Sequence, residues 1–251
     1  PLCLVGSEMC IRDSYKSLYE AIYHAGVHNK VNVKIKWIDS ETINKKNVDE
    51  LLIKAAGILI PGGFGNRGIS GKIEAIRYAR ENQIPFLGIC LGMQLSIIEF
   101  TKNVLKMKNS GSSEFGKHTN NVISLMTEWS KKNQKVTRTK ENDLGATMRL
   151  GSYPCYIKHK SLASKIYKKK LIHERHRHRY EVNPKYRSSI EKKGLVFSGF
   201  SKDKKLLEII ENKYHKWFLG VQFHPELKSK PFKPHPIFFS FIKNSLMNKN
   251  A

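Results

Sequence analysis

Along the first ninety residues, apolar side chains follow two alternating patterns, one typical of helices and one typical of strands. Residues 13–26 carry apolar side chains at helical spacing, with Asp13 or Ser14 able to cap the start of a helix and Gly26 placed to end it. Strand-like runs lie at 31–38, 55–60 and 84–89, and a second helical pattern lies at 71–82. This order is typical of a parallel sheet with crossover helices, so the predicted fold class is α/β, with an open, mostly parallel sheet flanked by helices.

The second half of the chain is less regular. From about 101 to 150 it is polar and rich in lysine, which we interpret as loops or a lid. Strand-like runs return at 153–158, 195–201, 206–213 and 217–227, and an amphipathic helix is predicted at 235–249. No internal repeat or second core is evident, so residues 1–251 predict one domain.

Composition narrows the class of protein. The four cysteines form no CxxC pair and show no metal-ligand spacing, which favours a reducing compartment and neither a disulfide framework nor a zinc site. No run approaches the roughly 20 apolar residues of a membrane span. The net charge of +24 suggests a polyanionic partner, but the lysines are scattered and no nucleic-acid signature accompanies them. We therefore expect a cytoplasmic protein that binds neither membrane nor nucleic acid.

Residues 88–94, GICLGMQ, place Cys90 between two glycines where a predicted strand meets a helix. This is the pattern of a nucleophile elbow, in which side chains two residues before and after the nucleophile would collide with the neighbouring chain. A helix N-terminus also favours a thiolate over a thiol. Taken alone, the motif is equally compatible with an inert buried cysteine.

A reactive thiolate needs a base, and residues 223–226, FHPE, offer one. His224 and Glu226 are two positions apart on an extended chain, so the carboxylate can orient the imidazole. Both Cys90 and His224 would lie at carboxyl ends of strands, where open α/β sheets place their sites. His-Pro-Glu alone could also be an ordinary turn.

The glycine-rich residues 61–65, PGGFG, follow another buried strand. Acyl transfer through a thioester needs two N–H donors for the oxyanion, and the N–H of Leu91 together with the loop at Gly63 and Phe64 could supply them. Alone the loop could be a simple turn. No phosphate-loop lysine follows it.

Together, these three motifs resemble the class I, or triad-type, glutamine amidotransferases, which have a flavodoxin-like architecture. The resemblance implies Cys90 as nucleophile, His224 as base and Glu226 as its orienting group, with Gly63 and Leu91 at the oxyanion hole. It implies L-glutamine as substrate. The expected glutamine-binding residues are Gly63, Phe64, Leu91, Gly92, Met93, Gln94, Glu114 and Arg179.

The residue types suit this ligand. Glu114 can bind an α-ammonium group, and Arg179 can hold an α-carboxylate in a fork. His176 and His178 also stand in the run at 174–179, but without a carboxylate or cysteine at ligand spacing they do not predict a metal site.

Residues 111–115, 143–151, 174–183 and 199–211 resemble one branch of this family. In that branch the glutaminase follows an amidoligase domain, not part of this sequence, that uses ATP, Mg²⁺ and UTP to make CTP, with GTP as allosteric activator. The resemblance implies no cofactor in the present domain and a homo-tetramer at full length. It places a GTP-responsive lid within 128–150, with Arg138 and Arg149 as candidate anion contacts.

Two alternatives remain at this point. A stand-alone cysteine hydrolase of the γ-glutamyl peptidase type would share the elbow but would not need Gln94, Glu114 and Arg179. A basic polyanion-binding module on an inactive scaffold would use the positive charge but would not explain an intact triad.

Overall fold

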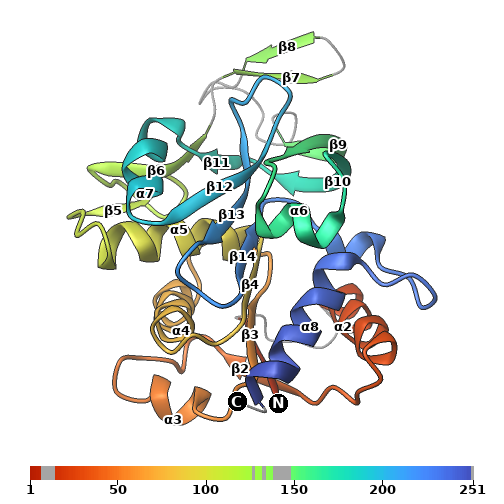
Figure 1. Ribbon diagram of the computed structural model, residues 1–251. Coiled ribbons are helices and arrows are strands. Elements are labelled where there is room, and N and C mark those ends of the chain that lie inside the picture. Colours follow the sequence, from red (N-terminus) through yellow and green to blue (C-terminus); the bar gives the residue numbers. More distant parts are fainter. Residues whose placement is uncertain (7–14, 126–127, 132–133, 138–147, 250–251) are drawn as a thin grey trace.

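The computed structural model describes residues 1–6, 15–125, 128–131, 134–137 and 148–249. Within these residues, nine strands form one sheet in the order β10-β9-β12-β13-β14-β4-β3-β1-β2 (Figure 1). The strands are β1 (Leu2–Gly6), β2 (Ile35–Asp39), β3 (Gly57–Ile60), β4 (Phe86–Ile89), β9 (Arg149–Ile157), β10 (Leu171–His178), β12 (Leu195–Phe200), β13 (Leu207–Asn212) and β14 (Phe218–Val221).

The sheet has a parallel half and an antiparallel half. β2, β1, β3, β4 and β14 are parallel, whereas β13, β12, β9 and β10 extend the sheet through antiparallel pairs. The predicted α/β fold class is therefore confirmed. The antiparallel extension comes from the strand-rich second half of the chain.

Helices cover both faces of the parallel half (Figure 1). Along β1, Cys3 and Val5 face one hydrophobic cluster and Leu2 and Leu4 face the other, which is the alternation expected of a strand buried on both sides. The first cluster is covered by α3 (Val48–Leu52), α4 (Ile69–Glu81) and α5 (Leu91–Asn103), and the second by α2 (Lys16–His28) and α8 (Pro236–Lys249).

The first helix differs from its prediction at both ends. α2 begins at Lys16, and the predicted caps Asp13 and Ser14 lie outside the described residues. Gly26 does not end the helix but is buried inside it, where a Cβ would lie 2.8 Å from Cγ2 of Val33. Close packing on the following segment, not a turn, explains this glycine.

The region expected to be loops or a lid contains short strands. β5 (Ser110–Ser112) and β6 (Asn120–Leu125) form a small sheet with β11 (Tyr180–Val182), and β7 (Glu128–Lys131) pairs with β8 (Gln134–Thr137). The loop prediction is wrong for these four strands, because their runs are short and mostly polar; β6 carries the buried Val122 and Ile123.

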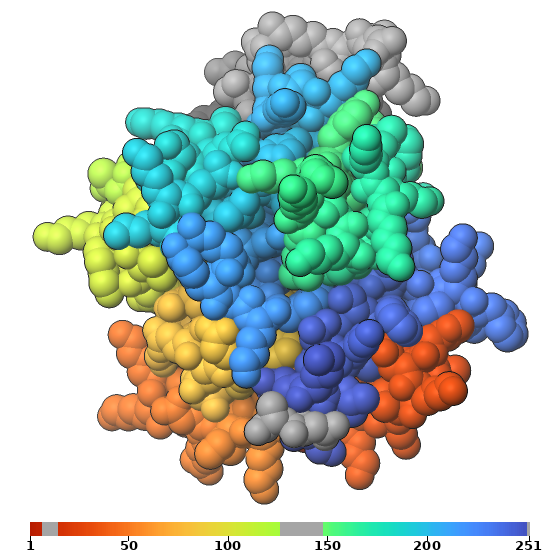
Figure 2. All heavy atoms as spheres, viewed as in Figure 1, coloured from red at the N-terminus to blue at the C-terminus, as the bar shows by residue number. Residues whose placement is uncertain are grey.

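The remaining elements are short and lie between the strands of the second half or after β14. They are α6 (Leu162–Tyr167), η1 (Pro184–Tyr186), α7 (Arg187–Lys192) and η2 (Pro225–Lys228). In the space-filling view the green surface of β9 and α6 directly adjoins the blue surface of α8 (Figure 2). The antiparallel half therefore packs on the layer that covers the second cluster, next to the carboxyl ends of the parallel strands.

Candidate active site

Cys90 lies in a strained turn between β4 and α5. Its backbone has φ 51° and ψ −101°, in a region that non-glycine residues rarely adopt, and its side chain is 3% exposed. A Cβ on Gly88 would lie 2.7 Å from the carbonyl oxygen of Gly92, and one on Gly92 would lie 2.3 Å from that of Ile60. Both glycines are thus required by the close approach of β4, α5 and β3.

His224 and Glu226 face this turn from the neighbouring strand. β14 runs parallel to β4, and the N–H of Cys90 donates to the carbonyl of Val221 at 2.7 Å. His224 follows the end of β14 and Glu226 lies in η2, with Nδ1 of His224 2.6 Å from Oε1 of Glu226. This contact fixes the orientation of the imidazole ring.

The electrostatics favour a charged imidazole. Burial alone lowers the pKa of His224, but the charge of Cys90 and hydrogen bonding to Cys90 and Glu226 outweigh it and raise the pKa to about 10. His224 is therefore protonated at neutral pH, with the Glu226 carboxylate beside it.

A cleft with a volume of about 650 Å³ opens beside the three residues. The glycine-rich loop forms part of its wall: a Cβ on Gly62 would lie 2.8 Å from Cε1 of His224, and one on Gly63 would lie 3.4 Å from Cδ2 of Leu91. The loop backbone thus packs closely against His224 and Leu91. The cleft is lined by Tyr15, Lys16, Ser17, Leu18, Pro61, Gly62, Gly63, Phe64, Ile89, Cys90, Arg177, His224, Glu226 and Leu227.

Two of the expected glutamine-binding residues lie together beside this loop. Oε1 of Glu114 accepts a hydrogen bond from the N–H of Gly65 at 2.9 Å. Burial raises the pKa of Glu114, while that hydrogen bond and the charge of Arg179 act in the opposite direction. The carboxylate and the guanidinium are therefore neighbours at the end of the 61–65 loop.

The other expected residues are arranged around the elbow. Gln94 is buried and donates to the carbonyl of Tyr180 at 3.0 Å and to Oε1 of Gln222 at 3.1 Å. Phe64 is half exposed and lines the cleft. Gly92 and Met93 are buried in the first turn of α5.

The candidate lid arginines are not part of this arrangement. Arg138 lies outside the described residues. Arg149 is not an exposed anion contact: it begins β9, is 2% exposed and pairs with the buried carboxylate of Glu208. Its charge is already matched inside the protein, which corrects the sequence-based expectation.

Sequence reasoning missed Gln222. Its Nε2 donates to Sγ of Cys90 at 3.7 Å, and its Oε1 accepts from Gln94. Gln222, His224 and Glu226 follow at two-residue intervals, which is the signal that could have identified it. Arg177, which lines the cleft, was missed because its strand was not predicted.

That strand, β10, is an edge strand, and its free edge faces the site. β9 pairs with one side of it. On the other side, the carbonyl of Arg175 accepts the N–H of His224 at 2.8 Å, the carbonyl of His173 accepts from Nζ of Lys228, and that of Arg177 lies 4.0 Å from Sγ of Cys90. The turn that carries the base is therefore attached to the main chain of β10.

Two further findings concern the described residues alone. They contain no group of three or more His, Cys, Asp or Glu side chains that could hold a metal ion. They also contain no helix long and apolar enough to cross a membrane.

Comparisons with known proteins agree with this geometry. The family model of class I glutamine amidotransferases matches residues 10–244. A CTP synthase from Pelagibacter ubique is 55% identical over 248 residues, which are 99% of this chain and 46% of that protein. One from Rhodospirillum rubrum is 51% identical over 245 residues, or 98% and 45%. The chain thus spans about half the length of the curated relatives it matches.

Solved structures give the same result. The glutaminase domain of Trypanosoma brucei CTPS with bound acivicin superposes with a TM-score of 0.88 at 36% identity, over 98% of this chain and 93% of that chain. A glutamine amidotransferase from Thermotoga maritima, at 12% identity and a TM-score of 0.53, shares the fold.

The chain therefore belongs to the class I glutamine amidotransferases. Within that family its similarity is to the glutaminase domains of CTP synthases, as the sequence resemblance predicted.

Proposed function

We propose that this chain hydrolyses L-glutamine to glutamate and ammonia through a thioester on Cys90. The observation that carries the proposal is the Cys90, His224 and Glu226 arrangement at the carboxyl ends of two adjacent parallel strands, beside an open cleft. The glutaminase domain of the trypanosomal relative, which binds acivicin, supports the same chemistry here.

The mechanism follows from the charge state of the site. The Cys90 thiolate adds to the carboxamide carbon of glutamine, and backbone N–H groups at Gly63 and Leu91 stabilise the oxyanion. The C–N bond then breaks as the His224 imidazolium protonates the leaving ammonia. His224, now neutral, removes a proton from water, which attacks the thioester and releases glutamate and the thiolate. Glu226 holds the imidazole throughout.

We further propose that the ammonia is used by an amidoligase part of the full-length protein for ATP-dependent amination of UTP to CTP. The support is the similarity of nearly the whole chain to CTP synthases about twice its length. ATP, Mg²⁺ and UTP would bind in that other part. GTP would act as activator, and the full-length protein would form a homo-tetramer in the cytoplasm.

The test separates the two reactions in the full-length protein. Cys90→Ala should lower CTP formation from glutamine by several orders of magnitude and leave CTP formation from ammonium chloride nearly unchanged. Cys3→Ala, which removes a buried thiol of the β1 core, is the matched control and should keep both rates. A Cys90→Ala protein that keeps its glutamine-dependent rate would exclude Cys90 as the nucleophile.

Covalent labelling provides an independent measurement. A chloroketone analogue of glutamine should alkylate Cys90 and leave Cys3 and Cys155 unmodified, as read by peptide mass spectrometry. Burial raises the pKa of the Cys3 and Cys155 thiols, which keeps them protonated. Equal labelling of the three in the folded protein would contradict the proposed activation of Cys90.

A further inference from the structure

The inner face of β10 is buried, yet most of its side chains are polar or ionisable, where apolar residues are the norm. Glu174, His176 and His178 alternate along the strand, and each is at most 2% exposed. Nδ1 of His176 lies 2.9 Å from Nε2 of His178, so the two imidazoles form a hydrogen-bonded pair. Burying such groups has a cost unless their contacts serve the fold or the site.

The pair is fixed in orientation at one end. Nδ1 of His178 lies 3.1 Å from the carbonyl oxygen of Tyr180, which can only accept, so this nitrogen carries a proton. Burial and the charge of Arg149 hold the pKa of His176 well below its usual value, so His176 is neutral. The two facing nitrogens, Nδ1 of His176 and Nε2 of His178, share one proton in this hydrogen bond.

Charged groups from other strands enclose the pair. Glu181 on β11 lies 3.6 Å from Nδ1 of His178, and Glu208 on β13 lies 3.9 Å from Nε2 of His176. Arg149 on β9 pairs with Glu208 and approaches Glu181 to 3.8 Å. The imidazoles thus connect β10 with three other strands.

On the free edge of β10, main-chain carbonyls next to His176 contact the catalytic residues. The carbonyls of Arg175 and Arg177, which flank His176, hold the N–H of His224 and face Sγ of Cys90. The His176 ring also meets that of Phe223 edge to face at 5.8 Å, next to His224 in the chain. His176 is thus linked to His224 and to Cys90 through the main chain of its two neighbours and through Phe223.

We propose that His176 and His178 are positioning residues for glutamine hydrolysis, and that their hydrogen-bonded pair holds the edge of β10 at the distance that keeps His224 aligned with Cys90. This inference rests on the proposed function. A misplacement of about 1 Å in such a site can cost roughly 100-fold in rate.

The test compares two substitutions at His176 in the full-length protein. His176→Phe keeps a ring that packs on Phe223 and Tyr153 but removes both nitrogens. His176→Asn keeps an amide that can form a hydrogen bond at the Nδ1 position but packs worse. We expect kcat for glutamine hydrolysis to fall at least about 10-fold in His176→Phe and less in His176→Asn, with the glutamine KM within about threefold in both.

The free energy of unfolding should rank the two variants in the opposite order to kcat. His176→Phe should be the more stable, because the phenyl ring fills the site and the shorter amide of His176→Asn leaves a void. Ile172→Ala is the matched control: it truncates another buried side chain of β10 and should lower stability while keeping kcat. The rate at which iodoacetamide alkylates Cys90 should fall in His176→Phe alone.

Two outcomes would overturn the inference. One is a kcat that tracks stability across the three variants, with His176→Phe the more active of the two His176 proteins. The other is an unchanged kcat and Cys90 alkylation rate in His176→Phe. If His176→Phe does not fold, then kcat, stability and the Cys90 alkylation rate are measured for His178→Gln and compared with those of Ile172→Ala. A parent protein without glutaminase activity would instead refute the proposed function.

Discussion

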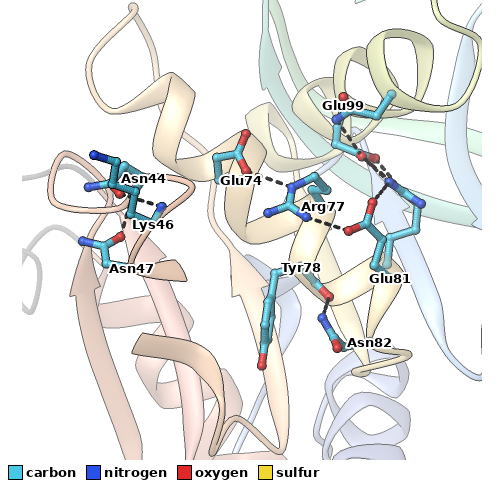
Figure 3. A network of polar contacts seen from close by, with 11 residues as sticks. Asn44, Lys46, Asn47, Glu74, Arg77, Tyr78, Glu81, Asn82 and Glu99 are labelled. Atoms are coloured by element: carbon cyan, nitrogen blue, oxygen red, sulfur yellow. Dashed lines mark hydrogen bonds and ion pairs between the residues drawn. The ribbon is translucent and has the colours of Figure 1, made fainter. Parts of the chain in front are cut away.

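Two networks of charged side chains in this molecule differ in where their members come from. On α4, Arg77 pairs with Glu74 and Glu81 (Figure 3). Arg80 pairs with Glu81 on the same helix and with Glu99 on the neighbouring α5. The two pairs of Arg77 are three and four residues apart on one helix, and both arginines remain in contact with solvent.

The second network lies between strands. Its members are Arg149, Glu181, Glu208, His176 and His178, and each is nearly inaccessible to solvent. Within the described residues, Nε of Arg149 and Oε2 of Glu208 have no hydrogen-bond partner. The Arg77 pairs of the helical network can form as soon as α4 forms, whereas the buried network exists only when four strands are in place. The first contributes local stability; the second fixes the geometry of the strands around the site.

The largest effect is expected at Glu208. Glu208→Gln keeps the shape of the side chain but leaves the buried charge of Arg149 without its partner, which should lower the free energy of unfolding by about 3–5 kcal/mol. Urea denaturation of this domain measures it. A loss below about 1 kcal/mol would mean that Glu181, 3.8 Å from Arg149, compensates the charge.

A smaller effect is expected at Glu99 in the helical network. Both oxygens of its buried carboxylate accept from Nε of Arg80, at 3.1 and 3.0 Å. Glu99→Gln should lower the free energy of unfolding by about 1–3 kcal/mol, because Arg80 stays partly solvated. The same denaturation series measures it, and kcat should not change. A loss equal to that of Glu208→Gln would remove the distinction between the networks.

The pH dependence of the free energy of unfolding should also distinguish the buried network, which contains His176, from the helical one. Because the pKa of His176 is lowered in the folded state, the unfolded chain binds a proton that the folded chain does not below pH 6.5. Stability is therefore lost as pH falls from 6.5, by at most about 1.4 kcal/mol per pH unit. His176→Phe should show a shallower loss than the parent between pH 7 and 5. Parallel curves would mean that His176 binds its proton equally well in the folded and the unfolded protein.

The smallest effect is expected at an exposed pair. Arg67 and Glu41 form two hydrogen bonds, but both side chains are nearly half exposed. Glu41→Gln should change the free energy of unfolding by less than about 1 kcal/mol, and less still at high salt. A larger, salt-independent loss would show that this pair is coupled to the rest of the fold.

The same contrast explains what could be predicted from the sequence. The elbow at Cys90, the loop at 61–65 and the His224 motif are each encoded within a few residues, because the glycines and the two-residue spacing are local requirements. β10 was not predicted, because its inner face presents Glu174 and histidines and so gives no alternation of apolar and polar residues. The burial of Arg149 depends on Glu208, 59 residues away, which no local pattern reveals.

The edge of β10 has a second consequence, for solubility. An uncovered edge strand offers a row of main-chain groups with which another polypeptide can pair, and this leads to aggregation. Here η2 and the N–H of His224 occupy that row. A substitution that detaches this turn should therefore do more than abolish catalysis, because it would expose a strand able to associate with a second copy of the protein.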